Sequence, residues 1–537
     1  MKAKREKYLA LMFAFFLIFI LYFCNQKDYF DGDEMFSYSL ANGYYTPFLR
    51  WNNDWWNTWH PIQYLTDQLT VGKGEGFQYA SVIYNQSQDV HPPFYYMILH
   101  TLCSLFPNTF TKWIGLGLNI ILYMLSGFLV YLITAIISDE NFYLSLGSTL
   151  AYMLCAMTIS DAIYIRMYML ATVLVLVDVY INISKDMITW KNSILLGFLT
   201  FIGGVTHYYY AIVAGIISFL VIILMLIDKR IKDAILYACF RIIGVVMIFV
   251  LYPAAKKQVF SGSRSITSKF GTMSDRKAFF EQLNYYWEQL GTKIYGYKEV
   301  FTVLVAMILF FLVGATFSAY KHKKMVCLNK KLVLVFLVQL LFFCFCVIYC
   351  PKVSFRQRYF YIVSPLIICS NYVLVNKLIK FELKEQFSHM MAVIACSVLI
   401  ITSLISVKDM KNIDYLHFDR QDVYEMVCEK GCNSHFFVNK GDSQEYSFWM
   451  QYINLARDDN NYFCVTTVDR LDNLSDSELQ EIMLPFADDG ILVYIITSYN
   501  TETATEMAKD IGMRIGLESC EYILTTNGER IFYISKG

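Results

Sequence analysis

Long apolar runs alternate with short polar or charged loops over most of the chain. The apolar runs cover 8–24, 113–137, 142–160, 163–183, 192–206, 208–227, 234–254, 297–318, 331–350, 358–377 and 388–406. A helix of about 20 apolar residues crosses the hydrocarbon core of a bilayer, because it rises about 1.5 Å per residue. The pattern therefore predicts a mainly α, polytopic transmembrane helical bundle with about eleven spans.

The apolar stretch 91–106 is predicted to lie on the outer membrane surface and not to cross. The strongly basic short loops lie at 185–191, 228–233, 321–331 and 377–384. All four face the cytoplasm only if 91–106 does not cross. His91-Pro92-Pro93 then starts a surface helix in the first outer loop. The N-terminus is expected in the cytoplasm, with the first run as an uncleaved anchor, since no small-residue cleavage site closes it.

The region 409–537 has a different composition, polar and charged. Runs typical of strands, SHFFVN, ILVYIIT and RIFYIS, alternate there with helix-like segments such as SDSELQEIM and ETATEMAKDIGM. This alternation predicts a small α/β domain. We therefore expect a transmembrane domain over 1–408 and an extracytoplasmic α/β domain over 409–537. No catalytic motif appears in the second domain, so a structural or acceptor-docking role is expected.

Composition agrees with a multi-pass membrane protein. Hydrophobic residues make up 56% of the chain and charged residues 17%, more apolar than an average soluble domain. The net charge is zero, so no global field attracts nucleic acid. The cysteines show no zinc-site pattern, and Cys428 and Cys432 are either a disulfide or a reduced pair.

Three carboxylates, Asp31, Asp33 and Glu34, follow the first apolar run closely. A solvated loop residue is the simpler interpretation for Asp31. Asp33 and Glu34 precede MFSYSLANGYY, an amphipathic stretch expected on the membrane surface. A partly desolvated acid there can be basic enough to take a proton from a hydroxyl. Asp33 and Glu34 are therefore candidate catalytic residues.

Basic and aromatic residues on the outer face need an explanation, because basic residues there oppose the positive-inside bias. Arg166 starts one span, and Arg356 and Arg358 open another. An anionic ligand is one explanation, since a guanidinium fits phosphate oxygens in a bidentate way; a snorkelling anchor is the alternative for Arg166. His207, at an outer turn, is either structural or a phosphate ligand. The tryptophans of 50–61 either form an interfacial belt or stack on a sugar.

Five stretches carry a resemblance to a known family. They are DGDEMFS, HPPFYYMILH, RMYMLATVL, THYYYAIV and RQRYFYIVSPL, in this order. Together they resemble the bacterial C-type (GT-C) membrane glycosyltransferases related to protein O-mannosyltransferases and lipid A aminoarabinose transferases, a family 39-like group. The resemblance covers roughly residues 1–405. Relatives often carry an acidic residue directly before the arginine of RMYML, whereas here the nearest, Asp161, stands five residues earlier.

The resemblance implies roles for individual residues. Asp33 matches the general base, and Glu34 is its acidic neighbour. The residues expected near the donor phosphate are Arg166, Arg358, His207, Tyr168 and Tyr359. The residues expected to line the cavity are His91, Tyr208 and Arg356.

The implied reaction moves a monosaccharide, hexosyl or pentosyl, from a polyprenyl-phosphate donor to an acceptor hydroxyl on the outer face, with inversion. The acceptor would be a protein, a lipid or a cell-wall glycan. No cofactor is expected; a divalent cation is compatible with this chemistry, but no motif requires one. The first alternative is a transporter or flippase for a lipid-linked glycan, which predicts charges near mid-span and inverted repeats. The second is a non-catalytic scaffold that displays the α/β domain.

Overall fold

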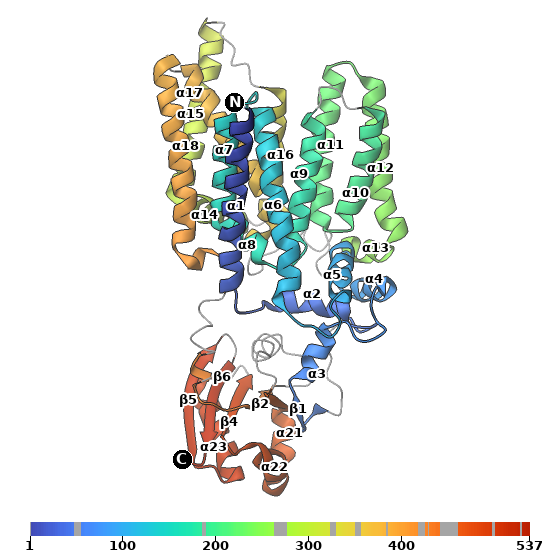
Figure 1. The fold of residues 1–537 in the computed structure, drawn as a ribbon, viewed down its shortest axis with the longest axis vertical. Helices are drawn as coiled ribbons and strands as arrows, with labels where there is room; N and C mark the ends of the chain where they lie inside the picture. Colours follow the sequence, from blue (N-terminus) through green and yellow to red (C-terminus); the bar gives the residue numbers. More distant parts are fainter. Residues whose placement is uncertain are drawn as a thin grey trace. The chain divides into compact units, whose positions relative to one another are not determined.

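The computed structural model describes residues 2–47, 55–184, 189–261, 276–322, 329–349, 356–382, 385–416, 425–427, 429–440, 460–496, 500–526 and 529–537. Contacts within the chain define two compact units, whose elements are labelled in Figure 1. The first unit comprises Met1–Gln26, Gln86–Tyr95 and Trp113–Asp414, and the second comprises Lys27–Asn85, Tyr96–Lys112 and Tyr415–Gly537.

The first unit is a helical bundle. Its longest helices are α1 (Lys2–Gln26), α6 (Lys112–Ile137), α11 (Tyr208–Ile227), α12 (Ile231–Leu251), α14 (Arg276–Tyr295), α15 (Lys298–His322), α16 (Lys330–Tyr349), α17 (Ser364–Glu382) and α18 (Glu385–Lys408). The others are α7 (Phe142–Leu154), α8 (Ala156–Ile163), α9 (Tyr168–Ser184), α10 (Trp190–Gly204), α13 (Ala254–Phe260) and the 3-10 helix η4 (Arg356–Val363). Every apolar run of the sequence falls on one or two of these helices, and α10, α11 and α12 lie side by side (Figure 1).

Fewer helices than the predicted eleven are both long enough and apolar enough to cross a membrane. Within the described residues, six helical segments qualify as membrane spans: those in α1, α6, α11, α12 and α16, and Gln357–Lys377. Helices α7 and α8, bent by 58° at Cys155, form a seventh if counted together. A multi-pass membrane protein is thus supported, while the count of about eleven is not confirmed. Helix α9 and the segment Cys396–Lys408 are apolar but shorter.

The stretch 91–106 forms a helix of its own, α5 (Phe94–Ser104), directly after Pro93. Its 11 residues span about 16 Å, too short to cross a bilayer. The expected helix start is confirmed, and its position on the membrane surface stays a prediction.

The second unit contains a six-stranded sheet in the order β1-β3-β2-β4-β6-β5. The strands are β1 (Trp59–Pro61), β2 (Ser434–Asn439), β3 (Tyr462–Thr467), β4 (Ile491–Ile496), β5 (Ser519–Thr526) and β6 (Glu529–Ser535). Strands β3, β2 and β4 are parallel, and the remaining pairs are antiparallel. The helices α21 (Val468–Asn473), α22 (Asp476–Met483) and α23 (Thr501–Ile515) complete the predicted α/β domain.

One strand of this sheet comes from the first loop and was not predicted. Trp59 of β1 pairs with Cys464 of β3. Its indole N–H donates to the carbonyl of Ile482 at 2.8 Å, and its ring stacks on Phe486 at 4.6 Å between centroids. Trp59 therefore belongs to the core of the sheet unit, which neither predicted role for the tryptophans describes. Residues 50–54 of the same stretch lie outside the described residues.

The predicted division of the chain into domains at residue 408 stays a prediction. The sheet also contains β1, whose residues lie outside the predicted domain 409–537. Cys432 is a buried free thiol, and its predicted partner Cys428 lies outside the described residues.

Candidate active site

A cavity of about 560 Å³ in the first unit collects most of the residues predicted from sequence. Its predicted lining residues are His91, Tyr168, His207, Tyr208, Arg358 and Tyr359. They come from the segment before α5, from α9, from the start of α11 and from η4. Of the remaining candidates, Arg166 contacts the lining residue His91. The side chain of Arg356 is not among those that the structure describes. Asp33 and Glu34 belong to the second unit.

Arg358 presents its guanidinium among aromatic rings. Its Nη1 donates to the hydroxyl of Tyr164 at 3.1 Å. The guanidinium carbon lies 6.0 Å from the ring centre of Tyr168 and 5.8 Å from that of Tyr359. A planar cation held against ring faces is weakly hydrated and preorganised to bind an anion.

A second charged group is built around His91. Its Nδ1 lies 2.8 Å from Oδ2 of Asp89 and 3.5 Å from Nη2 of Arg166. Burial raises the pKa of Asp89, but the charge and hydrogen bond of His91 and the charge of Arg166 outweigh it and hold this pKa below its usual value. Asp89 is therefore a carboxylate that neutralises part of the positive charge here, and the sequence analysis missed it. Its position two residues before His91 was the available signal.

His207 is a neutral histidine at the N-cap of α11. Its Nδ1 accepts the backbone N–H of Tyr209 at 3.1 Å, and its ring lies 5.0 Å from that of Tyr168. Burial, and then the charges of His91, Arg166 and Arg358, lower its pKa well below the usual value. A neutral imidazole that accepts at Nδ1 carries its proton on Nε2. His207 can therefore donate one hydrogen bond without adding charge.

The short helix α13 holds two walls of the cavity together through Gln258. The side-chain amide donates to the carbonyl oxygens of Gln86 at 2.8 Å and Asp89 at 2.7 Å. Its oxygen accepts the hydroxyl proton of Tyr208. No local sequence pattern identified Gln258, because its partners come from distant segments.

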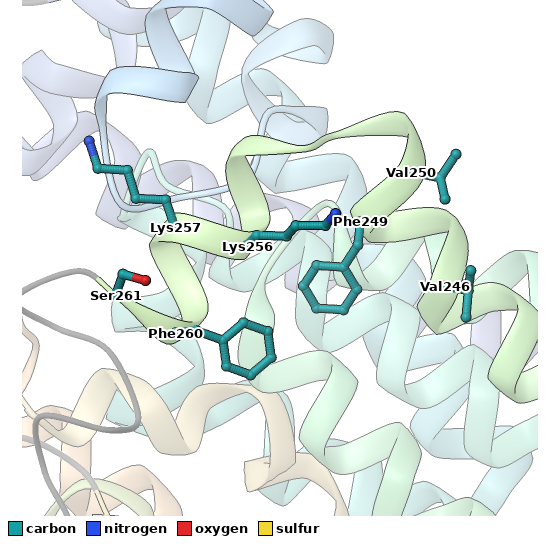
Figure 2. A pocket seen from close by; sticks show the side chains of 7 residues that line it. All are labelled: Val246, Phe249, Val250, Lys256, Lys257, Phe260 and Ser261. Atoms are coloured by element: carbon teal, nitrogen blue, oxygen red, sulfur yellow. The ribbon is translucent and has the colours of Figure 1, made fainter.

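A second, more open cavity of about 740 Å³ lies between α12 and α13 (Figure 2). Its walls are mainly apolar, and Lys256 and Lys257 stand on the α13 side. Figure 2 shows Lys256 extending toward Phe249. Phe249 lines both this cavity and the candidate active-site cavity, so the two cavities share part of one apolar wall.

In the second unit, α2 (Gly32–Asn42) carries the candidate acids at its N-terminus. Asp31 is the N-cap and accepts the N–H of Asp33 at 2.9 Å, while Glu34 accepts the N–H of Asp31 at 2.7 Å. This is a capping box, which stabilises a helix start. The sequence interpretation of Asp31 as a solvated residue is wrong, because it is 6% exposed.

Glu34 and Asp33 differ in burial and in ion pairing. Glu34 is completely buried and pairs with Nζ of Lys27 at 2.9 Å. Lys27 also donates to the carbonyl of Tyr415 at 2.8 Å. Glu34 is thus occupied in holding the helix start, and Asp33 is the partly exposed carboxylate of the three. Burial, followed by the charges of Asp33 and Glu34, raises the pKa of Asp31 to about 6.

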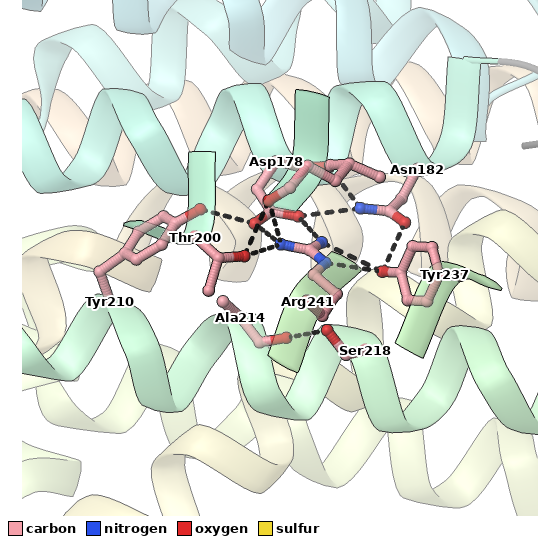
Figure 3. Close-up of polar contacts among 9 residues, drawn as sticks. Asp178, Asn182, Thr200, Tyr210, Ala214, Ser218, Tyr237 and Arg241 are labelled. Carbon is pink, nitrogen blue, oxygen red and sulfur yellow. Dashed lines mark hydrogen bonds and ion pairs between the residues drawn. The ribbon is translucent and has the colours of Figure 1, made fainter. Parts of the chain in front are cut away.

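The bundle also contains a buried charge pair, Asp178 and Arg241, that the sequence analysis did not single out. Arg241 of α12 binds both carboxylate oxygens of Asp178 of α9, at 2.5 and 2.8 Å (Figure 3). Hydrogen bonds from Tyr210 and Asn182 reach the same carboxylate, and Arg241 also donates to Thr200. Four helices, α9 to α12, are thereby joined through one buried network.

Two solved structures of ArnT from Cupriavidus metallidurans are similar to this chain. ArnT bound to undecaprenyl phosphate aligns over 98% of this chain and 98% of its own, with a TM-score of 0.51 and 8% identity. The chain has the fold of ArnT. ArnT in the apo state aligns over 82% of this chain and 87% of its own, with a TM-score of 0.42 and 10% identity.

The first of these matches confirms the C-type fold predicted from the five motifs, since ArnT is an aminoarabinose transferase of that group. No family model matches the chain, and no curated protein matches it significantly by sequence. Within the described residues, no cluster of three His, Cys, Asp or Glu side chains could hold a metal ion.

Proposed function

We propose that this protein is an integral-membrane glycosyltransferase that moves a monosaccharide from a polyprenyl-phosphate donor to an acceptor hydroxyl on the outer face, with inversion. The observation that carries the proposal is the cavity in which Arg358 and the neutral His207 stand among aromatic walls, with Arg166 behind His91. A phosphate on a long apolar chain matches such a cavity, because the cations meet the anion and the rings exclude water.

In this mechanism the acceptor hydroxyl attacks the anomeric carbon while the bond to the lipid phosphate breaks. The bidentate guanidinium of Arg358 and the Nε2–H of His207 stabilise the charge that develops on the departing phosphate. Arg166 acts on the same charge through its long-range field. One displacement inverts the anomeric configuration.

Asp33 is assigned the role of general base that takes the acceptor proton. The match of DGDEMFS to the family motif and the partial exposure of this carboxylate support the assignment. Glu34 is assigned a positioning role, because its carboxylate is already bound by Lys27.

The donor chain is assigned to the groove between α12 and α13. Phe249 lines both cavities and places an apolar side chain next to the phosphate site and to this groove, which supports the assignment. The ArnT structure of the same fold holds undecaprenyl phosphate, which supports a polyprenyl phosphate as the lipid part of the donor.

Incubation of the purified protein with a panel of synthetic polyprenyl-phosphate sugars tests the proposal. We expect release of polyprenyl phosphate from one or a few sugars, dependent on an added protein, lipid or glycan acceptor, and its loss in Arg358→Gln. Sugar that stays on its lipid across the panel and with every acceptor class would contradict the proposal.

A flippase for a lipid-linked glycan is the alternative that the buried Asp178–Arg241 pair favours, since intramembrane charges often mark transport pathways. The pair is enclosed by protein hydrogen bonds, which favours a structural role. Proteoliposomes with a fluorescent lipid-linked sugar separate the two functions. Movement of the lipid between leaflets without cleavage would favour the flippase.

A further inference from the structure

A third cavity lies at the opposite end of the helices that form the candidate active site. The active-site cavity meets Tyr168 of α9, Tyr209 of α11 and Tyr349 of α16, all at one end of these helices. The third cavity, of about 270 Å³, meets the other end of the same three helices. A helix of about 20 residues is about 30 Å long, the thickness of the hydrocarbon core. The two cavities therefore belong to opposite surfaces of the membrane.

Positive charge dominates the third cavity. Its lining residues include Arg230, Lys330 and Lys331, and one acidic residue, Asp228. Arg230 also pairs with Asp233, which is not among the lining residues, at 2.9 Å. Lys330 pairs with Asp228 at 2.8 Å, but both side chains are about half exposed or more, at 64% and 46%. Exposed ion pairs contribute little to stability, so an incoming anion can exchange with the carboxylate at low cost.

The cavity also adjoins an apolar helix surface. Leu224 and Leu334 form part of its wall. Near the same end of α11, Ile223, Leu226 and Ile227 are 37%, 50% and 65% exposed. A soluble anion gains nothing from such a surface, whereas acyl chains bury it.

Hydrogen bonds fix the position of Asn182 on the inner wall of the cavity. Asn182, which lines it, donates to the backbone carbonyl and the carboxylate of Asp178 at 2.8 and 2.9 Å. Its own oxygen accepts the hydroxyl proton of Tyr237 at 3.0 Å (Figure 3). Asn182 thus connects the cavity lining to the buried network that includes Arg241. A preorganised site loses less entropy on binding.

We propose that this cavity binds the phosphate headgroup of an anionic membrane phospholipid, with the acyl chains along the exposed face of α11. Basic pockets between transmembrane helices on the cytoplasmic side are suited to anionic headgroups, and the basic loops of the sequence predict that this face is cytoplasmic. The inference is independent of the sugar-transfer reaction, because it concerns the other end of the bundle.

Native mass spectrometry of the full chain in mild detergent tests the site, with dioleoyl-phosphatidylglycerol and dioleoyl-phosphatidylcholine as probes. We expect the wild type to retain phosphatidylglycerol preferentially. Lys330→Gln/Lys331→Gln is expected to weaken that binding by roughly 30-fold, because each lysine near an anionic headgroup contributes about five- to sixfold. The matched control is Lys7→Gln/Lys191→Gln, which removes two exposed lysines at other helix ends and should leave binding unchanged.

Three results would overturn the proposal. One is equal retention of phosphatidylglycerol and phosphatidylcholine by the wild type. This measurement does not depend on whether a variant folds. Another is an equal loss in both double variants, which would indicate diffuse surface charge. The third is displacement of phosphatidylglycerol by excess inorganic phosphate, which would assign the cavity to a soluble phosphate.

Discussion

The side-chain amide of Gln258 donates to the carbonyl oxygen of Asp89 at 2.7 Å, which ties helix α13 to the segment that carries His91. The same side chain accepts a hydrogen bond from Tyr208. Gln258, which the sequence did not predict, therefore holds two walls of the candidate active site together. Its substitution tests whether it positions the reacting groups or binds the donor.

Gln258→Ala is expected to lower kcat by about tenfold to a hundredfold with a smaller change in KM, because small displacements of reacting groups are costly. Sugar transfer under single-turnover and steady-state conditions measures this. Gln88→Ala is the matched control, since Gln88 is an exposed amide in the same segment. A rise in KM at constant kcat would show that Gln258 contributes to donor binding instead.

Arg358→Lys is expected to lose most of the activity, about a hundredfold to a thousandfold in kcat. Lysine keeps the charge but lacks the planar fork and cannot lie between the rings of Tyr168 and Tyr359 as a guanidinium does. Arg358→Gln in the same assay should be at least as poor. Wild-type turnover by Arg358→Lys would mean that charge alone is required.

Asp33→Asn should leave membrane insertion intact and reduce transfer by about a hundredfold to ten-thousandfold, the usual contribution of a general base. Asp28→Asn, the same change at a half-exposed carboxylate nearby, should retain activity. Normal turnover by Asp33→Asn would exclude this residue as the base.

The pH dependence of stability reports on Asp31. Its pKa rises from 3.8 to about 6 on folding, so the folded state binds more protons than the unfolded state between these values. Stability should therefore fall as pH rises through this window. Asp31→Asn keeps an N-cap side chain and should be more stable at pH 7 by on the order of 1–3 kcal/mol.

Apparent melting temperatures of the purified protein between pH 4 and 7 test this expectation. The melting temperature of the wild type should fall as the pH rises from 4 to 7, and that of Asp31→Asn should fall less. Parallel curves would mean that the carboxyl of Asp31 titrates normally in the folded protein.

Asp178→Asn should destabilise the bundle by about 3–5 kcal/mol, because it leaves the buried Arg241 without a counter-charge. Asp178→Leu with Arg241→Met should recover most of the loss, since well-packed apolar residues can replace a buried pair. Asp228→Asn, which breaks an exposed pair, should cost no more than about 1 kcal/mol. Thermal unfolding in detergent compares the three, and a double variant as unstable as Asp178→Asn would indicate another role for the pair.

The helices of the bundle and the α/β domain were predictable because both depend on local patterns. Each apolar run satisfies its own backbone hydrogen bonds as a helix, which the hydrocarbon environment requires. The strands β2, β4 and β6 likewise follow from short apolar runs with intervening helices. The start of α5 after Pro93 and the capping box at Asp31 follow from residues that are close in sequence.

The motifs also predicted six residues that line one cavity, including His207 and Arg358. They could not predict Gln258 or the pairing of Asp178 with Arg241. Asp178 and Arg241 were visible as charges within apolar runs, but nothing in either run specifies the other.

The sequence by itself determined which segments are helices, which segments form the α/β domain and which residue types carry the candidate chemistry. The tertiary structure decided which side chains meet: Trp59 with the sheet, Gln258 with Asp89, and three basic residues around the cavity at the far end of α11. The physical reason is that helix formation depends on hydrogen bonds between residues four apart. Contacts between distant residues depend on the packing of the whole bundle, for which no short stretch of sequence carries the information.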